Sequence, residues 1–179
     1  MAITNANPLR TQLGGTGSRF ASNVPVLGGR QSVYLLPGEF HASAEPCQIR
    51  TILGSCVSIC LWDANRLAGG MNHFLLPSSR EGEPSSLRFA DLATEALLEK
   101  LLQLGCRLAN LEAKIFGGGS MFQSKNRVAI SLGEQNVAAA LTRMKNARIP
   151  VKIQETGGTR GRKVVFNTDD GTAWCRRIG

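Results

Sequence analysis

The sequence predicts an α+β fold, a layered α/β sandwich whose mixed, largely antiparallel sheets are flanked by two main helices. Three observations carry this prediction: short β-prone runs fill the first and last thirds of the chain, two helical patterns lie between them, and strands and helices do not alternate regularly. The irregular order argues against a doubly wound parallel sheet. A length of 179 residues and a hydrophobic content of 42% are sufficient for one domain with its own core.

The first 30 residues differ from the rest in composition, and we expect them to form a flexible basic tail ahead of a single domain at 31–179. They contain Arg10, Arg19 and Arg30 but no Asp or Glu, and they are rich in Gly, Asn, Ser and Thr. Such a composition buries too little apolar surface to offset the entropy of ordering. Neither a secretory signal nor a run of ~20 apolar residues is evident, so we expect a cytoplasmic protein without membrane insertion.

The first strands are predicted at 32–36 and 49–53, two short β-prone runs that are each bounded by Gly, Pro or Ser. Two longer extended runs follow at 56–62 and 67–76, and the turn-forming residues 63–66 separate them. Two extended runs around a short polar turn are typical of a β-hairpin. We therefore expect these two runs to pair as antiparallel neighbours.

The middle of the chain carries the two helical patterns. From 89 to 104, apolar residues recur at helical spacing with charged residues elsewhere on the wheel, and Gly105 marks the end. A second helix is predicted at 136–147, with Pro150 just beyond it. Residues 111–116 between the helices are predicted to form a strand that leads into three glycines. The last third returns to extended chain, with strands predicted at 151–155, 163–167 and 172–176.

The net charge of +8 favours an acidic partner. Only 6% of the residues are aromatic, and the basic residues are not interleaved with stacking aromatics, so we expect no nucleic-acid binding. Arg160, Arg162 and Lys163 form a small basic cluster beside the predicted turn at Gly157-Gly158. This cluster fits either contact with an acidic protein surface or an ordinary solvated turn.

The cysteines and histidines do not form a recognisable metal or disulfide pattern. Five cysteines are an odd set without CxxC spacing, and the sequence has only two histidines, His41 and His73. A structural zinc site would need paired ligands at short intervals. A chain of this length can fold without disulfide bonds. We therefore expect no metal, no cofactor and no disulfide framework.

The predicted hairpin brings one cysteine and one histidine together. If residues 63–66 form the loop, Trp62 pairs with Leu67, and counting outward from that pair places Cys56 directly opposite His73. Directly paired residues share one face of a sheet, with Cβ atoms roughly 4.5–5.5 Å apart. A thiol and an imidazole are then within reach of each other, unless a bulge shifts the register.

A thiol beside an imidazole can act as a nucleophile at neutral pH, because a thiolate–imidazolium pair lowers the pKa of the thiol. Attack of Cys56 on an amide carbon produces an oxyanion, and His73 can then protonate the leaving amine. Gly54 and Ser55 let the backbone turn closely enough to offer N–H donors to that oxyanion. Either Thr51 or the Ser55 hydroxyl can orient the histidine.

The same residues also permit a purely structural interpretation. Cysteine is commonly a small buried hydrophobe, and a lone histidine beside an apolar run is usually a core residue with satisfied hydrogen bonds. Cys60 lies on the same predicted face as Cys56 but is not the residue opposite His73. Cys47, Cys60, Cys106 and Cys175 all stand in ordinary strand or helix contexts and are expected to be structural.

Several sequence blocks resemble the chemotaxis receptor glutamine deamidase (CheD) family, and they occur in family order from about residue 31 onward. Thr51-Ile-Leu-Gly-Ser-Cys-Val57 resembles the nucleophile segment of the family, and Gly69-Gly-Met-Asn-His-Phe-Leu-Leu-Pro77 resembles its histidine segment. The further matches are Leu111-Glu-Ala-Lys-Ile-Phe-Gly-Gly-Gly119 with Met121, Gly133-Glu-Gln-Asn136, and Gly157-Gly158 with Gly161-Arg-Lys-Val164.

The resemblance implies an α/β sandwich with Cys56, His73 and Thr51 as the catalytic residues. It implies a cysteine-dependent protein-glutamine glutaminase that converts glutamines of methyl-accepting chemotaxis receptors to glutamate through a thioester. The cytoplasmic domains of these receptors are the implied partners, together with a CheC-type phosphatase. The alternative function is a non-catalytic chemotaxis binding module that docks onto a receptor or a phosphatase.

Overall fold

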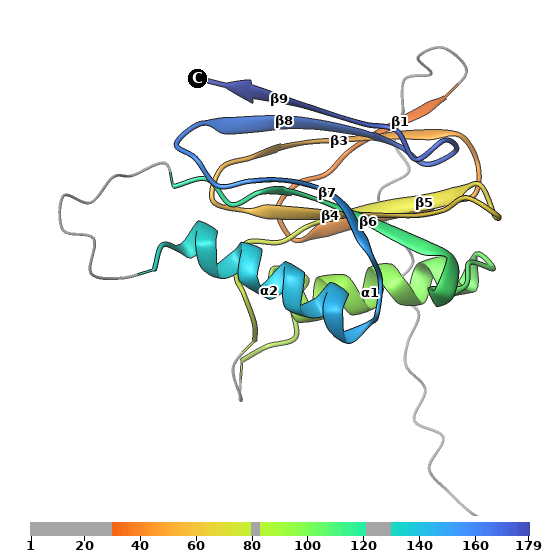
Figure 1. Cartoon of the computed structure of the whole chain (residues 1–179), viewed down its shortest axis with the longest axis horizontal. Helices are drawn as coiled ribbons and strands as arrows, with labels where there is room; N and C mark the ends of the chain where they lie inside the picture. Colours follow the sequence, from red (N-terminus) through yellow and green to blue (C-terminus); the bar gives the residue numbers. More distant parts are fainter. Residues whose placement is uncertain (1–29, 80–82, 121–129) are drawn as a thin grey trace, which may run out of the picture.

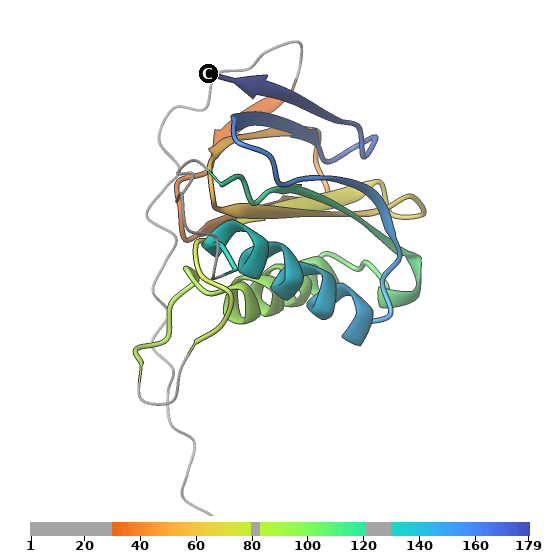
Figure 2. The same cartoon turned by 60° about the vertical axis from the view of Figure 1, so that its left-hand side comes forward.

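Two β-sheets packed face to face, with two helices on one outer face, make up the described part of the chain. The structure is a computed structural model in which residues 30–79, 83–120 and 130–179 are described. One sheet has the strand order β1-β3-β8-β9 and the other β2-β5-β4-β6-β7. Figures 1 and 2 show the three resulting layers: the four-stranded sheet, the five-stranded sheet and the helix pair. The predicted layered α+β sandwich is therefore confirmed.

Each sheet mixes antiparallel and parallel pairing, as the sequence predicts. In the four-stranded sheet only the β1–β3 pair is parallel, and in the five-stranded sheet only the β6–β7 pair is parallel. The strands of the first sheet are β1 (Gln31–Tyr34), β3 (Cys47–Leu53), β8 (Gly161–Asn167) and β9 (Ala173–Ile178). Those of the second are β2 (Glu39–Ser43), β4 (Val57–Asp63), β5 (Ala68–His73), β6 (Leu111–Gly117) and β7 (Val151–Thr156).

The two helices are α1 (Ala90–Gln103) and α2 (Leu132–Asn146), and a short 3-10 turn, η1 (Leu108–Asn110), precedes β6. Helix α1 agrees with the predicted helix to within a residue at each end. Helix α2 begins four residues earlier than predicted, because Ser131 and Glu134 cap its start reciprocally, side chain to backbone. Within the described ranges, neither helix combines the length and the apolar character needed to span a membrane.

Two cores hold the layers together, and strand β4 contributes to both. Val57, Ile59 and Leu61 belong to the core between the five-stranded sheet and the helices. Cys60 belongs to the core between the two sheets, and Trp62 packs against it. Since neighbouring residues on a strand face opposite sides, this alternation fixes which face each side chain of the hairpin takes.

Strand β2 has no counterpart in the sequence prediction. It pairs with β5 at an edge of the five-stranded sheet, where only Ala42 is buried and its other residues are partly exposed. A partly exposed edge strand leaves no clear alternation of apolar and polar residues. The strand predicted at 67–76 is also shorter, since β5 ends at His73 and its continuation makes only an isolated bridge, Val57 with Phe74.

The predicted hairpin register is wrong by two residues. Trp62 pairs with Gly69 instead of Leu67, and Asp63 pairs with Ala68. The side chain of Asp63 accepts hydrogen bonds from the backbone N–H groups of Asn65 and Arg66, so Asp63 closes the turn from its strand end. Leu67 has a positive φ of 51° and lies inside the turn. Cys56 is consequently diagonal to His73 and not directly opposite.

Candidate active site

Three side chains from separate segments point into the space between the sheets at one end of the sandwich. His73 is the last residue of β5, and its Nδ1 lies 2.9 Å from Oγ1 of Thr51. Thr51 belongs to β3 in the opposite sheet, so this contact spans the two layers. Both residues are buried, with exposed fractions of 1% for Thr51 and 2% for His73. The histidine ring is therefore held from across the core.

The hydrogen-bond chain at Thr51 determines the tautomer of His73. The Thr51 hydroxyl also lies 2.9 Å from the carbonyl oxygen of Leu35, which can only accept. A hydroxyl has one proton, so it donates to Leu35 and accepts from Nδ1–H of the imidazole. The other ring nitrogen, Nε2, then carries a lone pair, and it has no hydrogen-bond partner within the described part of the chain. His73 is thereby arranged as a proton acceptor at Nε2.

Cys56 lies in the loop just before β4, on the same side of the sheet as His73. The alternation along β4 gives Cys56 the face of Cys60, and its side chain packs against the core between the sheets. Val57 and Phe74 exchange two backbone hydrogen bonds of 3.1 and 3.0 Å, which fixes the register at this end. Cys56 and His73 flank this pair and are diagonal neighbours. Residues in that relation lie about 7–8 Å apart at Cα, a separation that longer side chains can span.

The backbone of the Cys56 loop is tied to the glycines that follow β6. The N–H of Gly118 donates to the carbonyl of Cys56, and the N–H of Gly119 donates to the carbonyl of Gly54, both at 2.8 Å. Gly117 has a φ of 110°, and a Cβ there would stand 2.2 Å from the Cys56 carbonyl oxygen. Only glycine allows this approach.

Asn136 on α2 joins the cysteine loop to the segment after the histidine. Its side-chain amide donates to the carbonyl of Ser55 at 3.0 Å and to the carbonyl of Leu75 at 2.7 Å. The residue is fully buried. A single side chain therefore fixes the distance between the loop of Cys56 and the strand end that carries His73.

Burial sets the electrostatics of the two reactive groups. It lowers the pKa of His73 to about 4 and raises the pKa of the Cys56 thiol. The adjacent backbone N–H of Cys56 favours the thiolate and offsets part of that rise in the pKa. Both directions favour the neutral thiol and the neutral imidazole.

Of the predicted site residues, the structure brings Thr51, Cys56 and His73 to one region, and Gly54 and Ser55 lie in the loop beside them. Gly54 and Ser55 use their carbonyls to anchor that loop, while Thr51 takes the position next to the imidazole. All five cysteines are free, and Cys47, Cys60 and Cys106 are buried. Among the described residues, no three His, Cys, Asp or Glu side chains gather as metal ligands would.

Comparison with known proteins identifies the family of this chain. Residues 75–177 match the family model described as CheD chemotactic sensory transduction. A protein named "Probable chemoreceptor glutamine deamidase CheD 1", from Anaeromyxobacter dehalogenans, is 48% identical over 158 residues, which cover 88% of this chain and 91% of that protein. The chain belongs to the CheD family.

Other CheD relatives are similar over most of their lengths. A probable chemoreceptor glutamine deamidase from Trichlorobacter lovleyi is 42% identical over 80% of this chain and 89% of its own. One from Methanococcus vannielii is 40% identical over 78% of this chain and 91% of its own. The family model begins after His73, whereas the alignment that covers 88% of the chain includes the Cys56 and His73 segments.

The sequence alone indicates no role for Asn136, although its side chain connects two segments of the site. The block Gly133-Glu-Gln-Asn136 resembles the family, yet nothing in its pattern indicates that its last side chain reaches two distant loops. Gly133 packs so closely on Gly118 that a Cβ would stand 2.5 Å from the Gly118 carbonyl oxygen. That close approach brings the start of α2 to the glycines behind Cys56. The run of glycines in the sequence is the signal that could have indicated this contact.

Proposed function

We propose that this CheD-family chain is a protein-glutamine deamidase, which hydrolyses side-chain amides of glutamines in methyl-accepting chemotaxis receptors to glutamate. In this proposal Cys56 is the nucleophile, His73 is its base and Thr51 orients the base. The observation that carries the assignment is the hydrogen-bond chain from Leu35 through Thr51 to Nδ1 of His73, which leaves Nε2 as a free acceptor.

The first half of the reaction forms a thioester. His73 Nε2 accepts the thiol proton while the sulfur attacks the amide carbon, so that a C–S bond forms and the carbonyl electron pair moves to oxygen. Because burial favours the neutral thiol and neutral imidazole, proton transfer accompanies attack instead of preceding it. In this proposal the backbone N–H of Cys56 donates to the oxyanion.

The second half releases the products. The imidazolium gives its proton to the amide nitrogen, the C–N bond breaks, and ammonia leaves a thioester on Cys56. His73 then takes a proton from water, whose oxygen attacks the thioester carbon. Collapse of that adduct breaks the C–S bond, returns the proton from His73 to the sulfur and gives a carboxylic acid, which passes its own proton to the released ammonia or to solvent and becomes the glutamate carboxylate.

The reaction changes the receptor by one negative charge at each modified glutamine, which alters the electrostatics of helix packing. The cytoplasmic domains of receptors are thus the substrate and principal partner. The proposal also includes a CheC-type phosphatase as regulator and a cytoplasmic location. It divides the chain into a tail at 1–30 and a domain at 31–179. Apart from Arg30, that tail lies outside the described residues.

Ammonia release tests the proposed function. The purified full chain is incubated with cytoplasmic fragments of the receptors from the same cell, and free ammonia is measured against a sample without enzyme. We expect release that depends on receptor glutamines and stops when they are replaced by glutamate. Absence of ammonia with every receptor of that cell would remove the enzymatic assignment and leave the binding-module alternative.

A further inference from the structure

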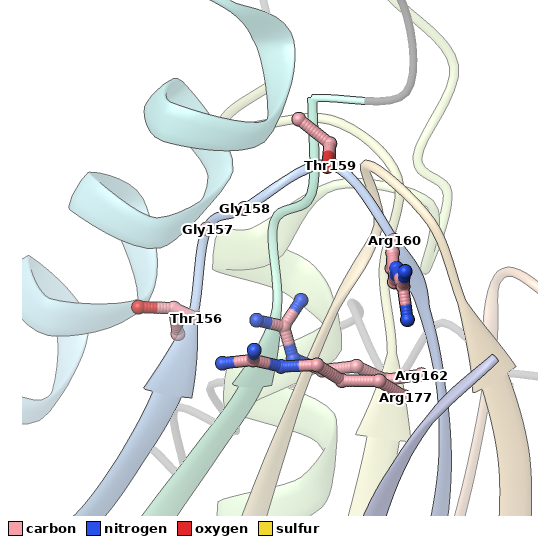
Figure 3. Close-up of a pocket in the computed structure, with 7 residues that line it drawn as sticks. All are labelled: Thr156, Gly157, Gly158, Thr159, Arg160, Arg162 and Arg177. Carbon is pink, nitrogen blue, oxygen red and sulfur yellow. The ribbon is translucent and has the colours of Figure 1, made fainter. Parts of the chain in front are cut away.

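Two arginines stand opposite each other where β8 and β9 pair, near the end of the sandwich that carries Cys56. Arg162 on β8 is the direct partner of Arg177 on β9, and Leu53 is the partner of Arg162 on its other side. Directly opposed residues share a face, so both arginines point toward the five-stranded sheet. With Arg160 and the turn at 156–159, they line a pocket of about 200 Å³. Figure 3 shows the two side chains extending in the same direction below the turn.

Arg162 is buried, and no ion pair joins it to a carboxylate among the described residues. Only 3% of the residue is exposed, and neither Nε nor Nη1 has a hydrogen-bond partner among the residues that the structure describes. A guanidinium stays charged in proteins, so burial without partners is unfavourable. The carboxylate of Glu155 approaches the Cys175 thiol, and no ion pair joins either arginine to a carboxylate within the described ranges.

The pairing of two like charges adds to this imbalance. Like charges directly opposite each other on neighbouring strands destabilise a sheet. An anion between the guanidinium groups would remove the repulsion and supply acceptors to the N–H groups that lack them. The forked guanidinium matches a carboxylate with two parallel hydrogen bonds. The pocket therefore has the chemistry of an anion site.

The pocket and the cysteine loop are held by the same short backbone segment. Gly157 donates to the carbonyl of Gly117 at 2.9 Å, and Ser120 donates to the carbonyl of Gly158 at 2.7 Å. Gly119 in the same segment donates to the carbonyl of Gly54 in the cysteine loop. The pocket and the cysteine loop are therefore joined through one backbone segment.

We propose that the Arg162–Arg177 pocket binds the side-chain carboxylate of an acidic residue in the substrate protein, near the glutamine that is deamidated. This assignment rests on the proposed function for its substrate and extends it to a preference for glutamines in acidic surroundings. The net charge of +8 agrees with an acidic substrate.

Binding is tested apart from catalysis. The Nε–Hε signals of the arginines are followed by NMR while N-acetylglutamate α-amide, which carries one carboxylate, or inorganic phosphate is added. We expect the signals of Arg162 and Arg177 to shift with the carboxylate, and the shift of Arg162 to disappear in Arg177→Gln. Arg176→Gln is the matched control, because Arg176 pairs with Lys163 and faces away from the pocket. Shifts with phosphate alone, or no shifts at all, would overturn the carboxylate assignment.

Kinetics test the link to the substrate. With a receptor fragment whose target glutamine has acidic neighbours, Arg177→Gln should raise KM about tenfold and leave kcat near wild type. Arg176→Gln should change neither. Replacing the acidic neighbours by alanine should raise the wild-type KM to a similar extent and abolish the effect of Arg177→Gln. An unchanged KM in Arg177→Gln, with an active wild type, would refute the role of the pocket and leave the proposed deamidase function intact. A wild type that is inactive but still shows the NMR shifts would refute the deamidase function and leave carboxylate binding intact.

Discussion

Thr51 and His73 belong to different sheets, yet the threonine hydroxyl lies 2.9 Å from Nδ1 of the imidazole. The hydroxyl bonds in turn to the carbonyl of Leu35. This chain places the proton of His73 on Nδ1 and leaves the lone pair on Nε2, which has no hydrogen-bond partner among the described residues. The proposed chemistry therefore depends on how the two sheets are stacked as well as on the hairpin.

Removing the Thr51 hydroxyl should slow the reaction without unfolding the protein. Thr51→Val keeps the shape of the side chain but leaves Nδ1–H without an acceptor, so the imidazole can adopt the other tautomer. We expect kcat to fall by about 10- to 100-fold, within the range of general acid–base contributions. Steady-state deamidation kinetics measure this, and Thr51→Ser should recover most of the rate. Equal rates in the valine and serine variants would contradict an orienting role.

The buried histidine should make the protein less stable in acid. The pKa of His73 is lowered to about 4, below the usual value of 6.5, so below pH 6.5 the unfolded chain binds a proton that the folded chain does not. The free energy of unfolding should thus be unaffected by this group above pH 6.5 and should fall as pH drops toward 4, by about 1.4 kcal/mol per unit.

Urea unfolding between pH 4 and 8 measures that dependence, and a His73→Asn variant isolates it. The slope between pH 4 and 6.5 should be shallower in His73→Asn than in wild type. His41 also has a pKa lowered by burial, so His41→Asn serves as a comparison with its own, separate effect. Identical pH dependence in wild type and His73→Asn would mean that the imidazole is not buried in its neutral form.

Asn136 should affect both stability and rate, because its amide fixes the carbonyls of Ser55 and Leu75. Asn136→Ala leaves two carbonyls without donors, which costs about 1–3 kcal/mol of stability. The loop of Cys56 is then free to move relative to His73, and kcat should fall at least about tenfold, since small misplacements are costly in catalysis. Gln135→Ala, on the exposed side of α2, is the control for both assays. A stable variant with full kcat would exclude a positioning role.

The contact between Gly117 and the Cys56 loop predicts a difference between two glycine substitutions. Both Gly117 and Gly157 have positive φ, but a Cβ at Gly117 would meet the Cys56 carbonyl at 2.2 Å, whereas none of the described atoms lies within 4 Å of a Cβ at Gly157. Gly157→Ala should cost about 1 kcal/mol from backbone strain alone. Gly117→Ala should cost at least about 3 kcal/mol by denaturant unfolding. Similar losses in the two variants would show that the close approach is absent.

The sequence predicts most of the elements because their patterns are local. The apolar periodicity of residues 89–104 is independent of the rest of the fold, and α1 follows it. Helix α2 starts before its apolar periodicity does, because Ser131 and Glu134 form a capping box ahead of it. Strand β2 gives no such signal, since its place at a sheet edge leaves it partly exposed.

The site is less accessible to sequence reasoning because it depends on contacts between distant segments. The hairpin register was wrong by two residues, yet a shift of two preserves the face of every side chain, so Cys56 and His73 remain on the same side. Which strand lies across from His73 depends on the stacking of two sheets, and no local pattern in Thr51 indicates it. Arg162 fitted a solvated turn equally well, and only the fold shows that it is buried.

Mass mapping of receptor fragments tests the central claim that Cys56, paired with His73, carries out the deamidation. Fragments are treated with wild type, Cys56→Ala or Cys60→Ala and compared residue by residue. The account predicts a gain of about one mass unit per modified glutamine with wild type and with Cys60→Ala, and none with Cys56→Ala. Equal modification by both variants would mean that another group is the nucleophile.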